Sequence, residues 1–183
     1  MNAAAVLVPG YGGSAEQPII RAMATQLTAV GVTPRAMAFS RKKPGGDFAP
    51  ELAELRHVRD ELLRSGATRV ALVGRSFGGR VCTRLAAAEP PPALVLLGHP
   101  ISPPNHPRPD DEAALAAVTC PTLIVQGDRD RLGPLAVLRR IARHNALIEI
   151  YVLAGAGHQF GARQAEGLRR AAEWLVTTLH EHV

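Results

Sequence analysis

The sequence has only two cysteines and no long hydrophobic run, and each shortage excludes a class of protein. A membrane-spanning helix needs about 20 consecutive apolar residues, and the apolar runs, such as those at 93–97 and 122–125, fall far short of that length. Cys82 and Cys120 lack the spacing of a metal site, and we expect buried thiols rather than a disulfide. The sequence therefore predicts no membrane span, no disulfide scaffold and no metal.

The chain also lacks an export signal and a concentrated block of charge. Residues 1–8 contain neither the basic region nor the cleavage site of a signal peptide, so we expect a cytoplasmic protein. The formal net charge is +5, but the densest basic runs are only residues 41–43 and 139–140. Because the other arginines are scattered, the charge predicts a solvated surface and no nucleic-acid partner.

What the sequence does contain is an alternation of short apolar runs and segments with helical spacing. With 183 residues, 46% hydrophobic and 20% charged, the chain fits one soluble domain spanning 1–183. The alternation predicts an α/β fold with a parallel sheet of about six strands and helices on both faces. The predicted strands are 3–8, 33–39, 69–73, 93–97, 122–126 and 147–153. The predicted helices are 19–30, 50–66, 80–88, 135–144 and a closing helix through 168–179.

The main chemical motif is Gly-Arg-Ser-Phe-Gly-Gly at residues 74–79, between a predicted strand and a predicted helix. A nucleophile elbow needs this strand-to-helix turn, with glycines where side chains would collide with it. The motif therefore predicts that Ser76 is a nucleophile at the start of a helix. There the N–H of Phe77 can stabilise a developing oxyanion, because the helix N-terminus favours negative charge.

A second oxyanion donor is expected from the Gly-Tyr-Gly-Gly loop at 10–13, after the first strand. This loop should face the elbow, because the carboxyl ends of neighbouring parallel strands meet at one edge of the sheet. By position, the N–H of Tyr11 is the predicted donor. Gly10 and Gly12 are candidate pocket residues, since glycines let the backbone turn toward a substrate. A simple tight turn is the alternative interpretation.

A serine nucleophile needs a base, and histidine has the matching pKa. His158 is the candidate, because it follows the sixth strand in a glycine-rich turn at the same sheet edge as the elbow. His99 also ends a strand at this edge, so it is either a pocket residue or a structural one, and Phe160 is a further pocket candidate. The remaining histidines lie in helices, in a proline-rich loop or near the terminus: His57, His144, His106, His180 and His182.

The acid that orients the histidine should follow the fifth strand, at Gly-Asp-Arg-Asp in residues 127–130. Either aspartate could point toward the histidine, because the choice depends on a local turn. We favour Asp130 over Asp128.

Together these residues resemble the lid-less, dienelactone-hydrolase-like branch of the α/β-hydrolases, and within it the testis-expressed-30 (KANSL3-type) hydrolase-fold proteins. The resemblance rests on the loop at 10–13 and on the motifs at 74–80, 96–100, 121–127 and 157–160. It implies that the second aspartate of the Gly-Asp-x-Asp pattern is the triad acid, which favours Asp130. The first loop departs from the family's usual His-Gly by reading Pro-Gly-Tyr, as in cutinase-like polyester hydrolases, so Tyr11 could form an aromatic wall.

The resemblance also implies a minimal α/β-hydrolase fold without a cap domain. Caps are commonly inserted between the fourth and fifth strands found here, where this chain has only a short connection that begins with a proline-rich loop at 101–111. We therefore expect an open, shallow site with no lid formed by this connection.

The predicted function is that of a serine hydrolase that cleaves small carboxylic esters through an acyl-enzyme on Ser76, with thioesters and lactones as further candidates. The expected partner is a small-molecule ester, and no cofactor is expected. The sequence does not predict the oligomeric state. The alternative is a hydrolase fold that serves as a binding or interaction module without significant turnover, because a fold alone does not fix a function.

Overall fold

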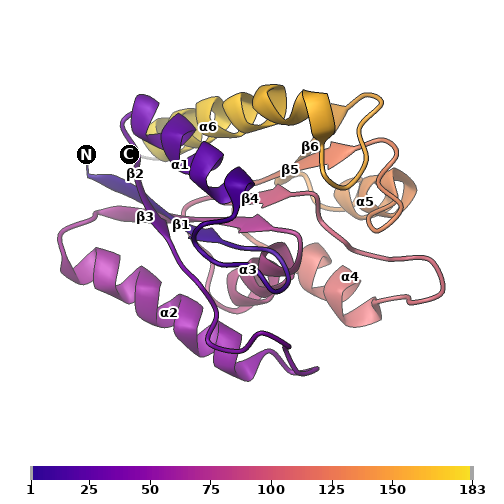
Figure 1. Cartoon of the computed structure of the whole chain (residues 1–183), viewed down its shortest axis with the longest axis horizontal. Helices are drawn as coiled ribbons and strands as arrows, with labels where there is room; N and C mark the ends of the chain where they lie inside the picture. Colours follow the sequence, from indigo (N-terminus) through magenta and orange to yellow (C-terminus); the bar gives the residue numbers. More distant parts are fainter. Residues whose placement is uncertain (1, 182–183) are drawn as a thin grey trace.

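The computed structural model describes residues 2–181 and contains a six-stranded sheet whose neighbouring strands are all parallel (Figure 1). The strands are β1 (Ala3–Val8), β2 (Thr33–Ala36), β3 (Arg69–Arg75), β4 (Leu94–Leu97), β5 (Thr122–Gly127) and β6 (Ile148–Leu153). Their order in the sheet is β2-β1-β3-β4-β5-β6. The first strand therefore lies next to one edge of the sheet, where β2 is added, and the later strands build toward the other edge.

Helices cover both faces of the sheet, as predicted (Figure 1). The helices are α1 (Pro18–Ala29), α2 (Ala49–Arg64), α3 (Phe77–Ala88), α4 (Pro109–Ala116), α5 (Leu135–Ala142) and α6 (Gln164–Glu181), with a short 3₁₀ helix at Gly161–Arg163. The apolar cluster on one face contains residues of α1 and α6, and the cluster on the other contains residues of α2 to α5.

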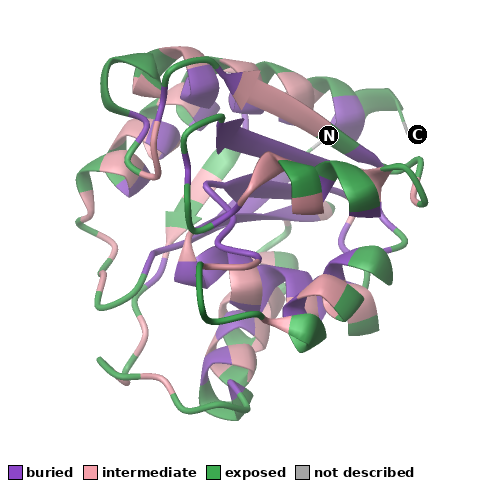
Figure 2. Cartoon of the chain, turned by 90° about the vertical axis from the view of Figure 1, so that its right-hand side faces the viewer, coloured by how far each residue is buried: buried purple, intermediate pink, exposed green. Residues whose placement is uncertain are grey.

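The strands at the centre of the sheet are buried between these two layers (Figure 2). In β1, successive side chains point to opposite faces: Leu7 joins the α1 and α6 layer, whereas Val6 and Val8 join the α2 to α5 layer. This continuous burial explains why the central strands appear in the sequence as unbroken apolar runs rather than as alternating patterns.

Several predicted boundaries shift in the structure, and one helix is new. The second strand ends at Ala36 rather than at residue 39. The connection between β4 and β5 also contains a helix that the sequence did not predict, α4, which starts at Pro109 and so shortens the expected loop at 101–111. This helix packs on α3 and α5 instead of standing over the sheet edge. Within residues 2–181 no segment forms a separate cap.

Both cysteines are free and buried, as predicted: Cys82 lies in α3, and Cys120 precedes β5. Among the helices of residues 2–181, none combines the length and the apolar character that a membrane span requires. The same part of the chain contains no cluster of three or more histidine, cysteine or acidic side chains placed to hold a metal ion.

Candidate active site

The predicted elbow forms where β3 ends at Arg75 and α3 begins at Phe77. Between them Ser76 has φ 49° and ψ −115°, a backbone conformation that side-chain-bearing residues rarely adopt. Such a turn needs glycines around it: a Cβ on Gly74 would lie 2.5 Å from the Cα of Gly79, and one on Gly78 would lie 2.4 Å from two carbonyl oxygens of the first strand and its loop. The glycines of the motif thus allow a turn that places the serine at the edge of the sheet.

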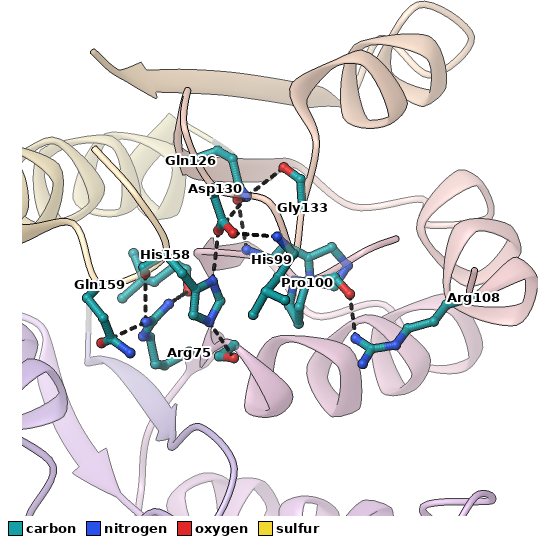
Figure 3. Close-up of polar contacts among 12 residues, drawn as sticks. Arg75, His99, Pro100, Arg108, Gln126, Asp130, Gly133, His158 and Gln159 are labelled. Atoms are coloured by element: carbon teal, nitrogen blue, oxygen red, sulfur yellow. Dashed lines mark hydrogen bonds and ion pairs between the residues drawn. The ribbon is translucent and has the colours of Figure 1, made fainter. Parts of the chain in front are cut away.

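The structure brings Ser76, His158 and Asp130 together in one chain of hydrogen bonds. The Oγ of Ser76 lies 2.9 Å from Nε2 of His158. The Nδ1 of the same ring lies 2.8 Å from Oδ2 of Asp130 (Figure 3). These side chains come from three separate strand ends, those of β3, β6 and β5, which meet at one edge of the sheet.

The carboxylate of Asp130 is buried and held by more than the histidine. Its Oδ2 also accepts a hydrogen bond from Nε2 of Gln126 at 2.9 Å, and its Oδ1 accepts one from the N–H of Leu132 at 2.9 Å. Asp128 points elsewhere and accepts a hydrogen bond from the N–H of Gly155. Of the two aspartates considered from the sequence, only Asp130 therefore contacts the histidine.

The glycine loop after β1 lies beside the elbow. An ideal Cβ on Gly10 would be 3.5 Å from the Cβ of Ser76, and the N–H of Gly10 donates to Oε1 of Gln17 at 3.0 Å, which holds the loop against the start of α1. Within residues 2–181 the N–H groups of Tyr11 and Phe77 donate no hydrogen bond to another part of the chain. Both are therefore free to bind an external acceptor.

A groove of about 330 Å³ opens beside Ser76 and His158. Its other lining residues combine backbone, three glutamine amides and a few apolar groups, with no acidic side chain: Gly10, Tyr11, Gln17, Pro18, Ile19, Arg75, Gln159 and Gln164. The ring of Tyr11 is 61% exposed and meets the ring of Phe77 edge-on, with 6.3 Å between the centroids. The groove is shallow enough for solvent to reach the serine and histidine.

Three of the candidate pocket residues do not line this groove. Gly12 borders a smaller hollow on the other side of the loop. Phe160 is buried in the apolar layer of α1 and α6, with the guanidinium carbon of Arg75 5.5 Å from its ring centroid. His99 is fully buried, and burial lowers its pKa to about 4. Its ring nitrogens have no hydrogen-bond partner within residues 2–181.

Sequence reasoning missed the residues that support the site from below. Gln126 supplies two contacts there: its Oε1 accepts from the N–H of His99, and its Nε2 donates to Asp130. Arg75 reaches the loop that carries His158. The only available signal was that both residues lie next to the motifs, Gln126 near the end of β5 and Arg75 beside the serine. That signal is weak, because a polar residue at the end of a buried strand can also face solvent.

Comparisons with known proteins place the fold. Residues 1–178 match the model of the alpha/beta hydrolase domain, and no curated protein sequence matches the chain. The structure of Est1E from Butyrivibrio proteoclasticus with ferulic acid bound has a TM-score of 0.85 at 17% identity, over 98% of this chain and 90% of that one. A serine hydrolase without a lid from Xanthomonas campestris has a TM-score of 0.78 at 22% identity, over 100% and 84%. Dienelactone hydrolase from Anabaena variabilis has a TM-score of 0.77 at 22% identity, over 97% and 85%.

Proposed function

Because the chain belongs to the alpha/beta-hydrolase family, we propose that it is a serine esterase that hydrolyses small carboxylic esters through an acyl-enzyme on Ser76. The observation that carries the proposal is the unbroken hydrogen-bonded chain from Ser76 through His158 to Asp130. Structural neighbours named as an esterase, a lipase and a dienelactone hydrolase support ester chemistry. Thioesters and lactones are further candidate substrates, because they present the same acyl carbon to a nucleophile.

In the first half-reaction, Oγ of Ser76 attacks the ester carbonyl carbon while Nε2 of His158 takes the hydroxyl proton. The carbonyl oxygen becomes an oxyanion that accepts hydrogen bonds from the N–H groups of Tyr11 and Phe77. Asp130 holds the ring in the tautomer whose Nε2 can accept a proton, and it stabilises the imidazolium that forms. The intermediate then collapses, and the alcohol leaves with the proton from Nε2.

In the second half-reaction, His158 removes a proton from water, which attacks the acyl carbon of the serine ester. A second oxyanion forms and collapses, Ser76 recovers its proton, and the carboxylic acid leaves. The open groove admits the water without a lid opening. Its modest volume, about 330 Å³, suits small esters better than long acyl chains.

The test is labelling with a fluorophosphonate combined with hydrolysis of chromogenic esters of increasing acyl length. We expect Ser76→Ala to abolish both, because the nucleophile is gone. Ser65→Ala is the matched control, since that hydroxyl caps the end of α2 far from the site, and it should keep both activities. Labelling that persists in Ser76→Ala would exclude this serine. A wild-type protein that neither labels nor hydrolyses any ester would favour the binding module.

A further inference from the structure

Arg75 precedes the candidate nucleophile and ties its strand to the segment that carries the candidate base. Its Nη1 donates to the carbonyl oxygen of Leu97 at the end of β4, at 3.0 Å. Its Nη2 donates to the carbonyl oxygen of His158 at 2.7 Å and to Oε1 of Gln159 at 3.3 Å (Figure 3). One guanidinium therefore connects β3, β4 and the loop after β6.

The side chain is almost completely buried, and its charge is not spent on an ion pair. Within residues 2–181 no carboxylate lies in salt-bridge contact with it. Burial lowers the pKa of Arg75 to about 10, partly offset by the nearby Asp130, so the group stays protonated at neutral pH. A buried charge costs free energy unless its hydrogen bonds are good. Charge-assisted bonds to carbonyl oxygens are also stronger than neutral ones, so they can hold a loop in place.

The segment after β4 packs closely against this guanidinium. Gly98 has φ +64°, and a Cβ there would lie 2.2 Å from Nη1 of Arg75. On another side, the ring of Phe160 packs against the guanidinium. The glycine after β4 and the buried phenylalanine after the base thus fit the arginine, which links three of the sequence motifs to one contact.

The other hydrogen bonds that hold the loop of His158 lie before or after the histidine. This loop follows β6 as Gly-Ala-Gly-His-Gln-Phe at 155–160, without large side chains before the histidine. Within residues 2–181 its other backbone hydrogen bonds include those from the N–H of Gly155 to Asp128, from the N–H of Arg129 to the oxygen of Ala156 and from the N–H of Phe160 to the oxygen of Gly157. In the same part of the chain, only Arg75 donates a hydrogen bond to the carbonyl oxygen of the histidine itself.

We propose that Arg75 is a positioning residue: by binding the carbonyl oxygen of His158 it fixes the imidazole at hydrogen-bond distance from Ser76. The proposal rests on the esterase function proposed above. It gives the residue before the nucleophile a defined role, since the side chain of the last residue of β3 determines how far the base lies from the serine. A base displaced by about 1 Å can cost roughly 100-fold in rate.

The test compares Arg75→Ala and Arg75→Lys with wild type on one soluble ester. We expect kcat to fall by about 100-fold in Arg75→Ala with at most a small change in KM, because the histidine moves while the other residues that line the groove remain. Arg75→Lys should recover little, since one ammonium cannot reach both carbonyl oxygens as the two guanidinium nitrogens do. Guanidinium ion at a non-denaturing concentration should restore part of the kcat of Arg75→Ala, because it can occupy the space of the lost group.

A second readout needs no ester substrate. The rate of fluorophosphonate labelling of Ser76 should fall in parallel with kcat, because labelling also needs the serine activated by the histidine. Arg84→Ala is the matched control: this arginine is also partly buried but pairs with Asp111. It should lower the unfolding temperature without changing kcat and without responding to guanidinium.

Each result decides the proposal. A kcat within threefold of wild type in both variants overturns it, and so does a rise in KM with kcat preserved, which would assign Arg75 to substrate binding. Failure of both variants to fold also overturns it, because the role is then structural. A wild-type protein that neither labels nor turns over esters refutes the esterase function itself. That outcome differs from an active wild type whose Arg75 variants are equally active.

Discussion

Two buried carboxylates in this molecule have opposite kinds of partners. Asp130 is held by a histidine ring, an amide and a backbone N–H. Asp111, at the start of α4, accepts hydrogen bonds from the guanidinium groups of Arg80 and Arg84 on α3. A carboxylate neutralised by permanent cations stabilises packing, whereas one that faces a titratable ring can stabilise the cation that forms when the ring takes a proton. The comparison suggests that the partner, rather than burial, separates a site carboxylate from a structural one.

We call the surroundings of the candidate acid the first region and those of Asp111 the second region. Arg80 and Arg84 both lie over the ring of Phe48, at 4.8 and 4.7 Å from its centroid. The pKa of Asp111 is lowered, since hydrogen bonds and charge from the two arginines outweigh the opposing effect of burial. His99 is buried nearby, and the charges of Asp111 and Arg80 affect its pKa in opposite directions. Its ring nitrogens have no hydrogen-bond partner within residues 2–181. This region is therefore strongly paired at one point and unpaired at the next.

The largest effect is expected from a substitution in the first region. Asp130→Asn should lower kcat by about 10⁴-fold, because an amide in place of the carboxylate favours the wrong tautomer of His158 and cannot stabilise its cation. Asp128→Asn is the matched control on the same loop and should change kcat little, since its carboxylate binds the N–H of Gly155 rather than the histidine ring. Steady-state kinetics on one soluble ester measures both. If the two variants exchange effects, the acid has been assigned to the wrong aspartate.

The strand ends of the first region could be predicted from the sequence because local chemistry marks them. Glycines surround Ser76 and precede His158, and both follow apolar strands, so the parallel topology brings them to one edge. Asp130 was favoured over Asp128 because it lies deeper in the loop, and the family resemblance supported that choice. The support from Gln126 and Arg75 could not be predicted, because it depends on side-chain directions across strands that are far apart in sequence.

The second region was missed for a physical reason. Helix α4 has eight residues, and only Asp111 and Leu115 among them are buried, so it has no apolar stripe that periodicity could detect. A proline at its first turn and three acidic residues after it do mark a helix start. What holds the helix in place is the pairing of Asp111 with arginines about 30 positions earlier, and no local pattern in the sequence records that contact.

The next largest effect breaks this pairing. Asp111→Ala should lower the free energy of unfolding by about 3 kcal/mol, because two arginines lose a buried partner but can still reach solvent. Asp110→Ala is the matched control in the same helical turn, with an exposed side chain, and should cost well under half as much. Denaturant unfolding measures both. If the pairing of Asp111 is purely structural, kcat per folded molecule should stay unchanged in Asp111→Ala. A large loss of kcat would show that the two regions are coupled.

The smallest expected effect concerns His99 and appears only in acid. The pKa of this ring is lowered from 6.5 to about 4 in the folded protein, mainly by burial and also by the charges of Arg80 and Arg108, against the opposing charges of Asp111 and Asp130. Between these two values the unfolded chain binds a proton that the folded chain does not, so stability rises with pH there. The contribution of His99 is therefore complete above about pH 6.5 and is lost as the pH falls toward 4.

From pH 7 to pH 5 this loss amounts to about 2 kcal/mol, since each pKa unit is worth about 1.4 kcal/mol. His99→Leu removes the titrating group along with two unpaired nitrogens, so it should fold with nearly wild-type stability at pH 7 and lose less on acidification. His57→Gln is the matched control, because that side chain is 68% exposed on α2, and it should keep the wild-type pH dependence. Glu51 and Asp111 add their own losses in acid, so the informative quantity is the difference between wild type and variant in urea unfolding at the two pH values. Parallel curves for wild type and His99→Leu would mean that the ring finds a partner when protonated, and the contrast between the two regions would then disappear.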